Sequence, residues 1–120
     1  MVLAEHCYRL TKAFPREELF AMSSQIRRSA PSIPANIAEG NGRYSASDRC
    51  RFFDIARGSA LECAAILDVL VARKVLTEKE IETGKASLIE IVNMLVGLIR
   101  SNSESRLHED EVLYKVGQQI

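Results

Sequence analysis

The sequence has few of the residues that build turn-rich β proteins, and it has no excess of charge. It contains no Trp, 6% aromatic residues, six Gly and three Pro, which is too little turn-forming and strand-forming material for a β sandwich. Sixteen Lys and Arg balance sixteen Asp and Glu, so the formal net charge is zero. Binding through the overall charge of the molecule is therefore excluded, and any preference for a charged partner must be local.

Cysteine and long apolar runs are also scarce. The three cysteines, Cys7, Cys50 and Cys63, are widely spaced without a Cys-x-x-Cys pair, so the sequence predicts neither a disulfide framework nor a zinc site. We expect Cys63, which lies on an apolar helical stripe, to be a small core residue. No basic segment precedes the short apolar run that stops at Glu5, and no run approaches the ~20 residues of a membrane span. These features predict a cytoplasmic protein without membrane contact.

What the sequence does contain is a helical pattern. Of its 120 residues, 47% are hydrophobic and 27% are charged, which is typical of one soluble domain. Apolar residues recur at spacings of three and four in four segments, and we expect helices at about 2–13, 15–39, 45–74 and 77–103. The stripe of the third segment is a heptad seam of Phe52, Ala56, Ser59, Cys63, Ile66 and Leu70. The fourth segment has an unusually wide apolar face, to which a second stripe contributes Ile89, Val92, Val96 and Ile99.

The expected helix ends carry capping signals. Pro15 suits a first turn, and Gly40 follows the last apolar position of the second segment. The runs 45–48 and 77–80 resemble capping boxes, and the run 101–103 is expected to end the fourth helix.

Two prolines fall inside the second segment. Pro31 and Pro34 each remove a backbone donor and crowd the carbonyl four residues earlier. We therefore expect a kink or short break at residues 29–33, with Ser29, Ser32 and Asn36 bonding the freed backbone groups.

These segments predict an all-α fold, an up-down-up-down four-helix bundle with a proline-kinked second helix, over residues 1–103. Residues 104–120 are expected to form a C-terminal extension with a short helix at about 109–119, which docks on the bundle or on a neighbouring subunit. The wide apolar faces of the third and fourth helices predict contact with another chain. The alternative is that these faces only fill a large core.

Catalytic residue patterns are absent. His6 and His108 lie near opposite ends of the chain, and neither belongs to a Glu-x-x-His pair. The run 40–42 lacks the lysine of a phosphate loop. We therefore predict that the protein is not an enzyme and uses no cofactor or metal.

Positive charge gathers in one window. Residues 25–57 hold six arginines, no lysine and three acidic residues, a net charge of +3, whereas residues 101–120 carry −2. Arginine is preferred for bidentate contacts to phosphate. Arg43, Arg49 and Arg51 are the candidate nucleic-acid contacts, and Tyr44 could stack on a base. The alternative is that such arginines form structural ion pairs, with Arg28 and Arg57 the foremost examples.

Two segments carry a family resemblance. The runs Ser32–Gly40 and Ala56–Glu62, together with Phe14-Pro15, Arg28 and Arg43, resemble the four-helix-bundle family encoded by intervening sequences in 23S ribosomal RNA genes. One branch of that family, the accessory protein of diversity-generating retroelements, is a pentamer that binds nucleic acid and a reverse transcriptase. The resemblance therefore implies a homo-oligomer, with a pentamer as the expected form, that binds RNA or DNA and a partner protein.

The resemblance also implies a network of shared polar positions between the second and third helices. Its members are Arg28, Ser32, Asn36, Glu39, Arg57, Ser59 and Glu62. Because a buried charge needs a partner, we expect Glu39 and Glu62 to face Arg57 or Arg28.

Two functions remain open at this point. The first is a non-enzymatic, oligomeric protein associated with RNA or another nucleic acid, which the arginine window favours. The second is an oligomeric scaffold or protein-interaction module without nucleic acid, which the zero net charge favours.

Overall fold

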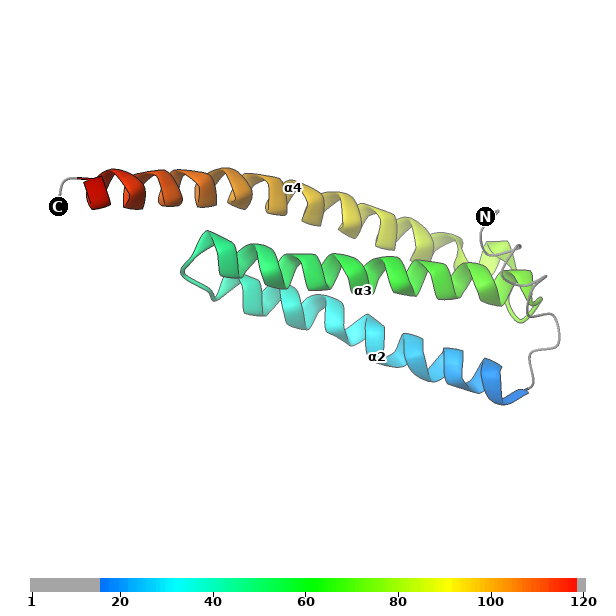
Figure 1. Ribbon diagram of the computed structural model, residues 1–120. Coiled ribbons are helices and arrows are strands. Elements are labelled where there is room, and N and C mark those ends of the chain that lie inside the picture. The colour runs from blue at the N-terminus through cyan, green and yellow to red at the C-terminus, as the bar shows by residue number, and fades with distance from the viewer. Residues whose placement is uncertain (1–15, 119–120) are drawn as a thin grey trace.

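The computed structural model describes the backbone of residues 16–118 and the side chains of residues 16–104. This part of the chain is all-helical, without strands, and forms three helices: α2 (Arg16–Asn41), α3 (Ala46–Ala72) and α4 (Glu78–Gln118). They run up, down and up, joined by short turns (Figure 1). The helix predicted over residues 2–13 lies outside the described residues. The all-helical prediction is therefore confirmed, and the fourth helix of the bundle stays a prediction.

The predicted capping signals mark the helix starts. The Ser45 side chain accepts a bond of 3.1 Å from the backbone N–H of Asp48, which caps α3. At the start of α4 the capping box is reciprocal, because Thr77 Oγ1 accepts from the Glu80 N–H at 3.1 Å and Glu80 Oε1 accepts from the Thr77 N–H at 3.0 Å. These local bonds satisfy donors that a helix start leaves free.

Both prolines lie inside α2 without interrupting it. The helix is continuous through residues 29–33, so the expected break is absent and the kink stays a prediction. Pro31 and Pro34 withdraw the usual donors from the carbonyls of Arg27 and Ala30. Asn36 bonds the carbonyl of Ser32 at 2.8 Å, which is a neighbouring group and not one of those two.

The prediction that the fourth helix ends at residues 101–103 is wrong. α4 continues to Gln118, so the helical conformation predicted for the extension is part of the same helix. The polar residues at the expected end have helical partners: Asn102 Nδ2 donates to the Leu98 carbonyl at 2.8 Å, and Ser103 Oγ lies 3.7 Å from Cys50 Sγ on α3. Contacts with α3 thus outweigh the weak helix propensity of this run. The docking of the extension stays a prediction.

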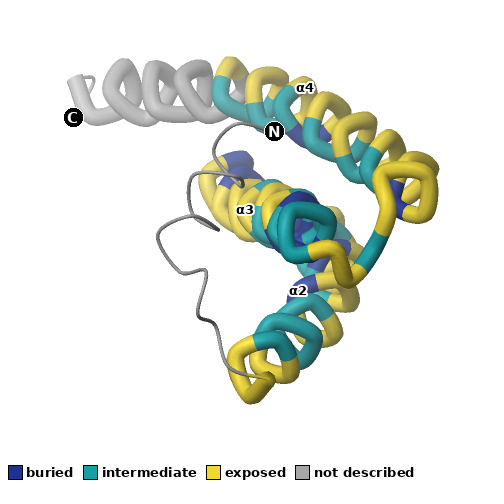
Figure 2. Tube along the Cα trace, turned by 90° about the vertical axis from the view of Figure 1, so that its right-hand side faces the viewer, coloured by how far each residue is buried: buried dark blue, intermediate teal, exposed yellow. Residues whose placement is uncertain are grey.

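The middle helix forms the core. α2 and α4 each pack on α3 and not on each other within the described residues, and most buried positions lie on α3 (Figure 2). Phe53 and Leu95 are each 1% exposed, and Cys63 is 2% exposed, as predicted for a core cysteine. Because Ala60 is small, side chains of both neighbouring helices reach the cluster around it.

The molecule is elongated, with extents of 65 × 26 × 23 Å. Near the end of the described side chains, Asn102 and Ser103 of α4 still contact α3. Beyond them α4 continues past the α2–α3 turn (Figure 1). At 1.5 Å per residue, residues 104–118 project by about 22 Å.

Candidate nucleic-acid interface

The turn between α2 and α3 brings the four candidate contacts to one end of the two-helix pair. α2 ends at Asn41, and the backbone N–H of Gly42 bonds the Ala38 carbonyl at 3.1 Å. The next residues, Arg43 and Tyr44, lie outside any helix, and Tyr44 is 100% exposed. Arg49 and Arg51 follow in the first turns of α3, so all four predicted residues gather around this turn.

Two of the arginines lie against one aromatic ring. The guanidinium carbon of Arg43 is 4.7 Å from the centroid of the Phe52 ring, and that of Arg51 is 4.9 Å from it. Such cation–π contacts fix the direction of a long side chain while its charge stays in water. Arg43 also pairs with Glu39 at 3.2 Å, an exposed pair that weakens its charge only in part.

Arg49 makes structural hydrogen bonds and does not contact the Phe52 ring as Arg43 and Arg51 do. Its Nε donates to Asn102 Oδ1 at 2.7 Å, and its Nη1 donates to the backbone carbonyls of Arg43 and Tyr44. These bonds join the turn to α4. Arg49 is half-buried and positions the turn, and its predicted role as a direct phosphate contact stays untested.

The exposed part of this interface is therefore small and well defined. We use the name arginine turn for Arg43, Tyr44, Arg51 and Phe52. It presents two guanidinium groups and one phenol ring to solvent, which is the chemistry for phosphate contacts and for stacking on an unpaired base.

The predicted polar network between α2 and α3 is only partly assembled. Ser32 Oγ and Ser59 Oγ are 3.0 Å apart across the two helices, and Asn36 Nδ2 donates to Ser32 Oγ at 2.9 Å. These bonds link Ser32, Asn36 and Ser59 as the resemblance implied, next to the proline segment.

The charged members pair differently from the prediction. Arg57 bonds Asp54, one turn earlier on α3, at 2.7 Å, and Glu39 bonds Arg43. The expectation that Glu39 faces Arg57 or Arg28 is therefore wrong, because its partner is Arg43. The reason is that partners three or four residues away along the chain are reached without crossing to a neighbouring helix.

Glu62 has its partners on α2. Its Oε1 accepts a hydrogen bond from Gln25 Nε2, and Arg28 Nη2 donates to Gln25 Oε1 at 2.8 Å. Bonds from Gln25 and Ser29 and the nearby charge of Arg28 lower the pKa of Glu62. Arg28 thus supports Glu62 electrostatically, with Gln25 between them.

A stability test follows from the lowered pKa of Glu62. The ionised form is stabilised by folding, so its contribution is present above the unfolded pKa and is lost as pH falls through the folded pKa. We expect Glu62→Gln to lower the free energy of unfolding at neutral pH by about 1 kcal/mol or less. The deficit should shrink in acid, as measured by urea unfolding across pH. Glu90→Gln, at an exposed position, is the control, and a deficit that is constant with pH would contradict this assignment.

Several residues that matter here were not identified from the sequence. Phe52 was placed in the core seam, whereas it is half-buried and holds two arginines. Asp68 is buried on α3 and pairs with Lys85 of α4. The sequence did contain a signal for this buried pair, because Asp68 lies in the middle of an apolar run.

The described residues contain no group of three His, Cys, Asp or Glu side chains that could hold a metal ion. Burial raises the pKa of the Cys63 thiol, which makes it a poor nucleophile. In the described part of the chain, no helix has both the length and the apolar character to cross a membrane.

The fold defines a class: an all-α protein of long, sequentially packed helices with a polar link between α2 and α3. The family model of the 23S rRNA-intervening sequence protein matches residues 1–97. The chain therefore belongs to the 23S rRNA-intervening sequence protein family. No curated protein and no solved structure matches it.

Proposed function

We propose that this chain is a non-enzymatic, oligomeric protein that binds RNA or another nucleic acid through the arginine turn. One observation carries the proposal: Arg43, from the turn, and Arg51, from α3, both contact the ring of Phe52. The stacking holds two exposed guanidinium groups in place beside a fully exposed tyrosine. The entropy cost of ordering them on a phosphate backbone is thereby reduced.

The proposal includes the finer architecture and the oligomer. Residues 1–15 supply the first helix of a four-helix bundle, and copies of the chain associate, with the pentamer of the related retroelement branch as the expected number. Large apolar side chains on α3 and α4 remain exposed and support self-association. They are Ile55, Leu61, Ile89, Met94 and Leu98. In such an assembly the arginine turns repeat, so several can engage one backbone at once.

The decisive experiment measures binding to a structured RNA stem-loop as a function of salt. We expect Arg43→Ala with Arg51→Ala to weaken binding and to reduce the salt slope by roughly 1.4–1.8, since each phosphate contact contributes about 0.7–0.9. The effect should be similar for all RNA sequences, because phosphate contacts position a protein without specifying a sequence. The assembly state of each variant is checked by multi-angle light scattering.

The matched control removes the same charge elsewhere. Arg16→Ala with Arg27→Ala changes two exposed arginines of α2 outside the arginine turn. It should leave most of the binding and of the salt slope intact. Equal effects of both double variants would show non-specific attraction, and no effect of either would leave the scaffold function, which the zero net charge favours, as the better account.

A further inference from the structure

The arginine turn carries one aromatic ring that the fold leaves uncovered. Tyr44 is 100% exposed, whereas the next most exposed large apolar side chain of the described residues, Phe20, is 72% exposed. A fully exposed ring contributes no packing to the fold, and both of its faces are open to a partner. The side chain of Tyr44 is therefore available for binding.

The backbone that carries this ring is held in place. Arg49 Nη1 donates to the carbonyls of Arg43 and Tyr44, so the peptide groups on both sides of Tyr44 are bonded. Arg49 is in turn held by α4, because its Nε donates to Asn102 Oδ1 at 2.7 Å and Asn102 Nδ2 donates to the Leu98 carbonyl at 2.8 Å. An open side chain on a fixed backbone loses less entropy when a partner covers it.

The two guanidinium groups of the arginine turn lie close to each other. The guanidinium carbons of Arg43 and Arg51 are 4.7 and 4.9 Å from the same ring centroid, so they are at most about 10 Å apart. One strand carries a phosphate per ~3.4 Å of helix axis, so both groups can contact phosphates within about three nucleotides. Tyr44 directly follows Arg43 in the chain, which places its ring beside the same few nucleotides.

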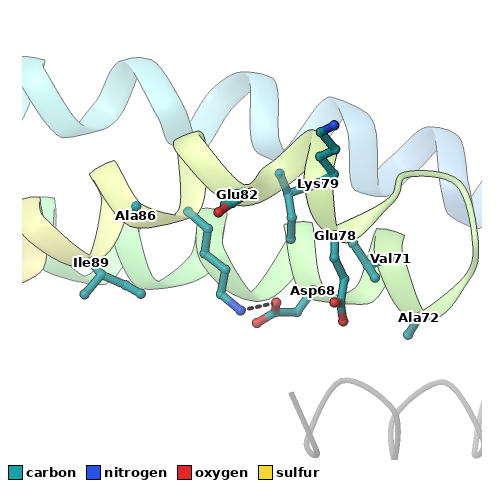
Figure 3. A pocket seen from close by; sticks show the side chains of 10 residues that line it. Asp68, Val71, Ala72, Glu78, Lys79, Glu82, Ala86 and Ile89 are labelled. Carbon is teal, nitrogen blue, oxygen red and sulfur yellow. Dashed lines mark hydrogen bonds and ion pairs between the residues drawn. The ribbon is translucent and has the colours of Figure 1, made fainter.

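The cavity at the other end of α3 does not share these properties. It measures about 800 Å³ and lies between the end of α3 and the start of α4 (Figure 3). Its lining carries three acidic residues and two lysines, and one of these lysines, Lys85, pairs with Asp68. Asp68 Oδ2 is buried there without a hydrogen-bond partner among the described residues. The excess of negative charge repels phosphate, so the arginine turn is the better of the two sites for a nucleotide strand.

We propose that the arginine turn recognises unpaired nucleotides, with a base stacked on Tyr44 and the neighbouring phosphates bound by Arg43 and Arg51. This inference rests on the proposed binding of nucleic acid by the same turn and adds the substrate class, a single strand or a loop of RNA or DNA. An unpaired base has a free face for the tyrosine ring. In a duplex the bases are stacked on one another, and side chains cannot read the narrow major groove of an RNA helix.

The preference between single strand and duplex separates stacking from simple charge attraction. A duplex has twice the phosphates of one strand over the same base pairs, and each contact releases more counterions, about 0.9 against about 0.7. A patch that acts through charge alone therefore binds the duplex more tightly. Stacking reverses this order, since each stacked base raises the affinity by roughly fivefold or more.

The test compares one strand in its unpaired and paired forms. The full-length chain is titrated at low salt into a fluorescent strand without self-complementarity, and into the same strand annealed to its complement, in RNA and in DNA versions. Fluorescence anisotropy should show at least about fivefold tighter binding to the single strand than to the duplex for one sugar or for both. Tighter binding to the duplex with both sugars would overturn the inference.

Variants of the ring then locate the preference. Tyr44→Ala should lower the single-strand affinity by about fivefold or more and leave the duplex affinity nearly unchanged, whereas Tyr44→Phe keeps the ring and should keep the preference. Phe20→Ala is the matched control, because it removes an exposed ring near the opposite end of α2 and should change neither affinity. Equal losses for Tyr44→Ala and Phe20→Ala would contradict the assignment.

A further variant tests the part of the fixed backbone. Asn102→Ala removes the anchor of Arg49 without removing a charge, so the single-strand affinity should fall several-fold while the salt slope keeps its parental value. An unchanged affinity would show that Arg49 does not position Tyr44 for binding.

Failure of this inference can be told apart from failure of the proposed function. If the parent bound neither the strand nor the duplex, nucleic-acid binding by the arginine turn would itself be refuted. If the parent bound both and Tyr44→Ala lost no single-strand affinity, the turn would contact phosphates alone, and only the selection of unpaired nucleotides would be refuted.

Discussion

Replacing Lys85 with methionine should lower the free energy of unfolding by about 3 kcal/mol or more. Asp68 is 6% exposed, and Lys85 is the partner of its Oδ1. Removing the lysine leaves a buried carboxylate with both oxygens unpaired, and breaking a buried pair in this way costs several kcal/mol. Urea unfolding followed by circular dichroism gives the difference directly.

The matched control changes both partners together. The pair Asp68→Leu with Lys85→Met replaces the charges by apolar side chains of similar size, and it should recover stability to within about 1 kcal/mol of the parent. A single Lys79→Met, at an exposed position on the rim of the cavity that Asp68 and Lys85 also line, should have a small effect on the free energy of unfolding. If Lys85→Met and Lys79→Met were equally mild, the buried pair would not contribute to the fold.

Replacing Gly40 with alanine should cost about 2 kcal/mol, an overpacking effect. A Cβ atom at this position would lie 2.6 Å from Phe53 Cε1 and 2.8 Å from Phe53 Cδ1. Phe53 is 1% exposed, so its ring has no free space into which it could move. The glycine therefore sets how closely the end of α2 approaches α3.

Another glycine provides the control for this prediction. At Gly58, in the middle of α3, a Cβ would meet nothing within 4 Å, so Gly58→Ala should stabilise the protein by about 0.5–1 kcal/mol through helix propensity. A smaller side chain at position 53 should relieve the clash with the new Cβ atom, so Gly40→Ala should cost less stability in a Phe53→Leu background. Equal stability changes for Gly40→Ala and Gly58→Ala would show that helix propensity alone determines the effect of these substitutions.

The starts of α3 and α4 could be predicted from the sequence because their causes are local. Ser45 and Thr77 cap with backbone groups three residues away, which spacing alone can indicate. The continuation of α4 through Asn102 could not be predicted in this way. It depends on Arg49 and Cys50, about fifty positions earlier, which meet α4 only in the folded chain.

The seam predicted for α3 holds along most of the helix, because Ala56, Cys63, Ile66 and Leu70 are buried. At its start, however, Phe52 of the seam is half-buried, and the buried side chain is the adjacent Phe53, which periodicity assigned to the flank of the seam. A seam is a good guide when a helix faces one neighbour, whereas α3 packs on two, and its buried arc is wider than a heptad stripe. The orientation of Phe52 also affected the candidate site, because the two arginines that stack on its ring take their positions from it.

The sequential packing of the helices has a consequence for synthesis on the ribosome. Every helix contact in the described residues joins neighbours along the chain, and such local topologies fold in microseconds to milliseconds. At about 5–20 residues per second, the 41 residues of α4 take roughly 2–8 s to translate. The α2–α3 hairpin, with Gly40 against Phe53, can therefore form first. For those seconds the other side of α3 is exposed to neighbouring nascent chains, so translation order determines which surface α3 meets first.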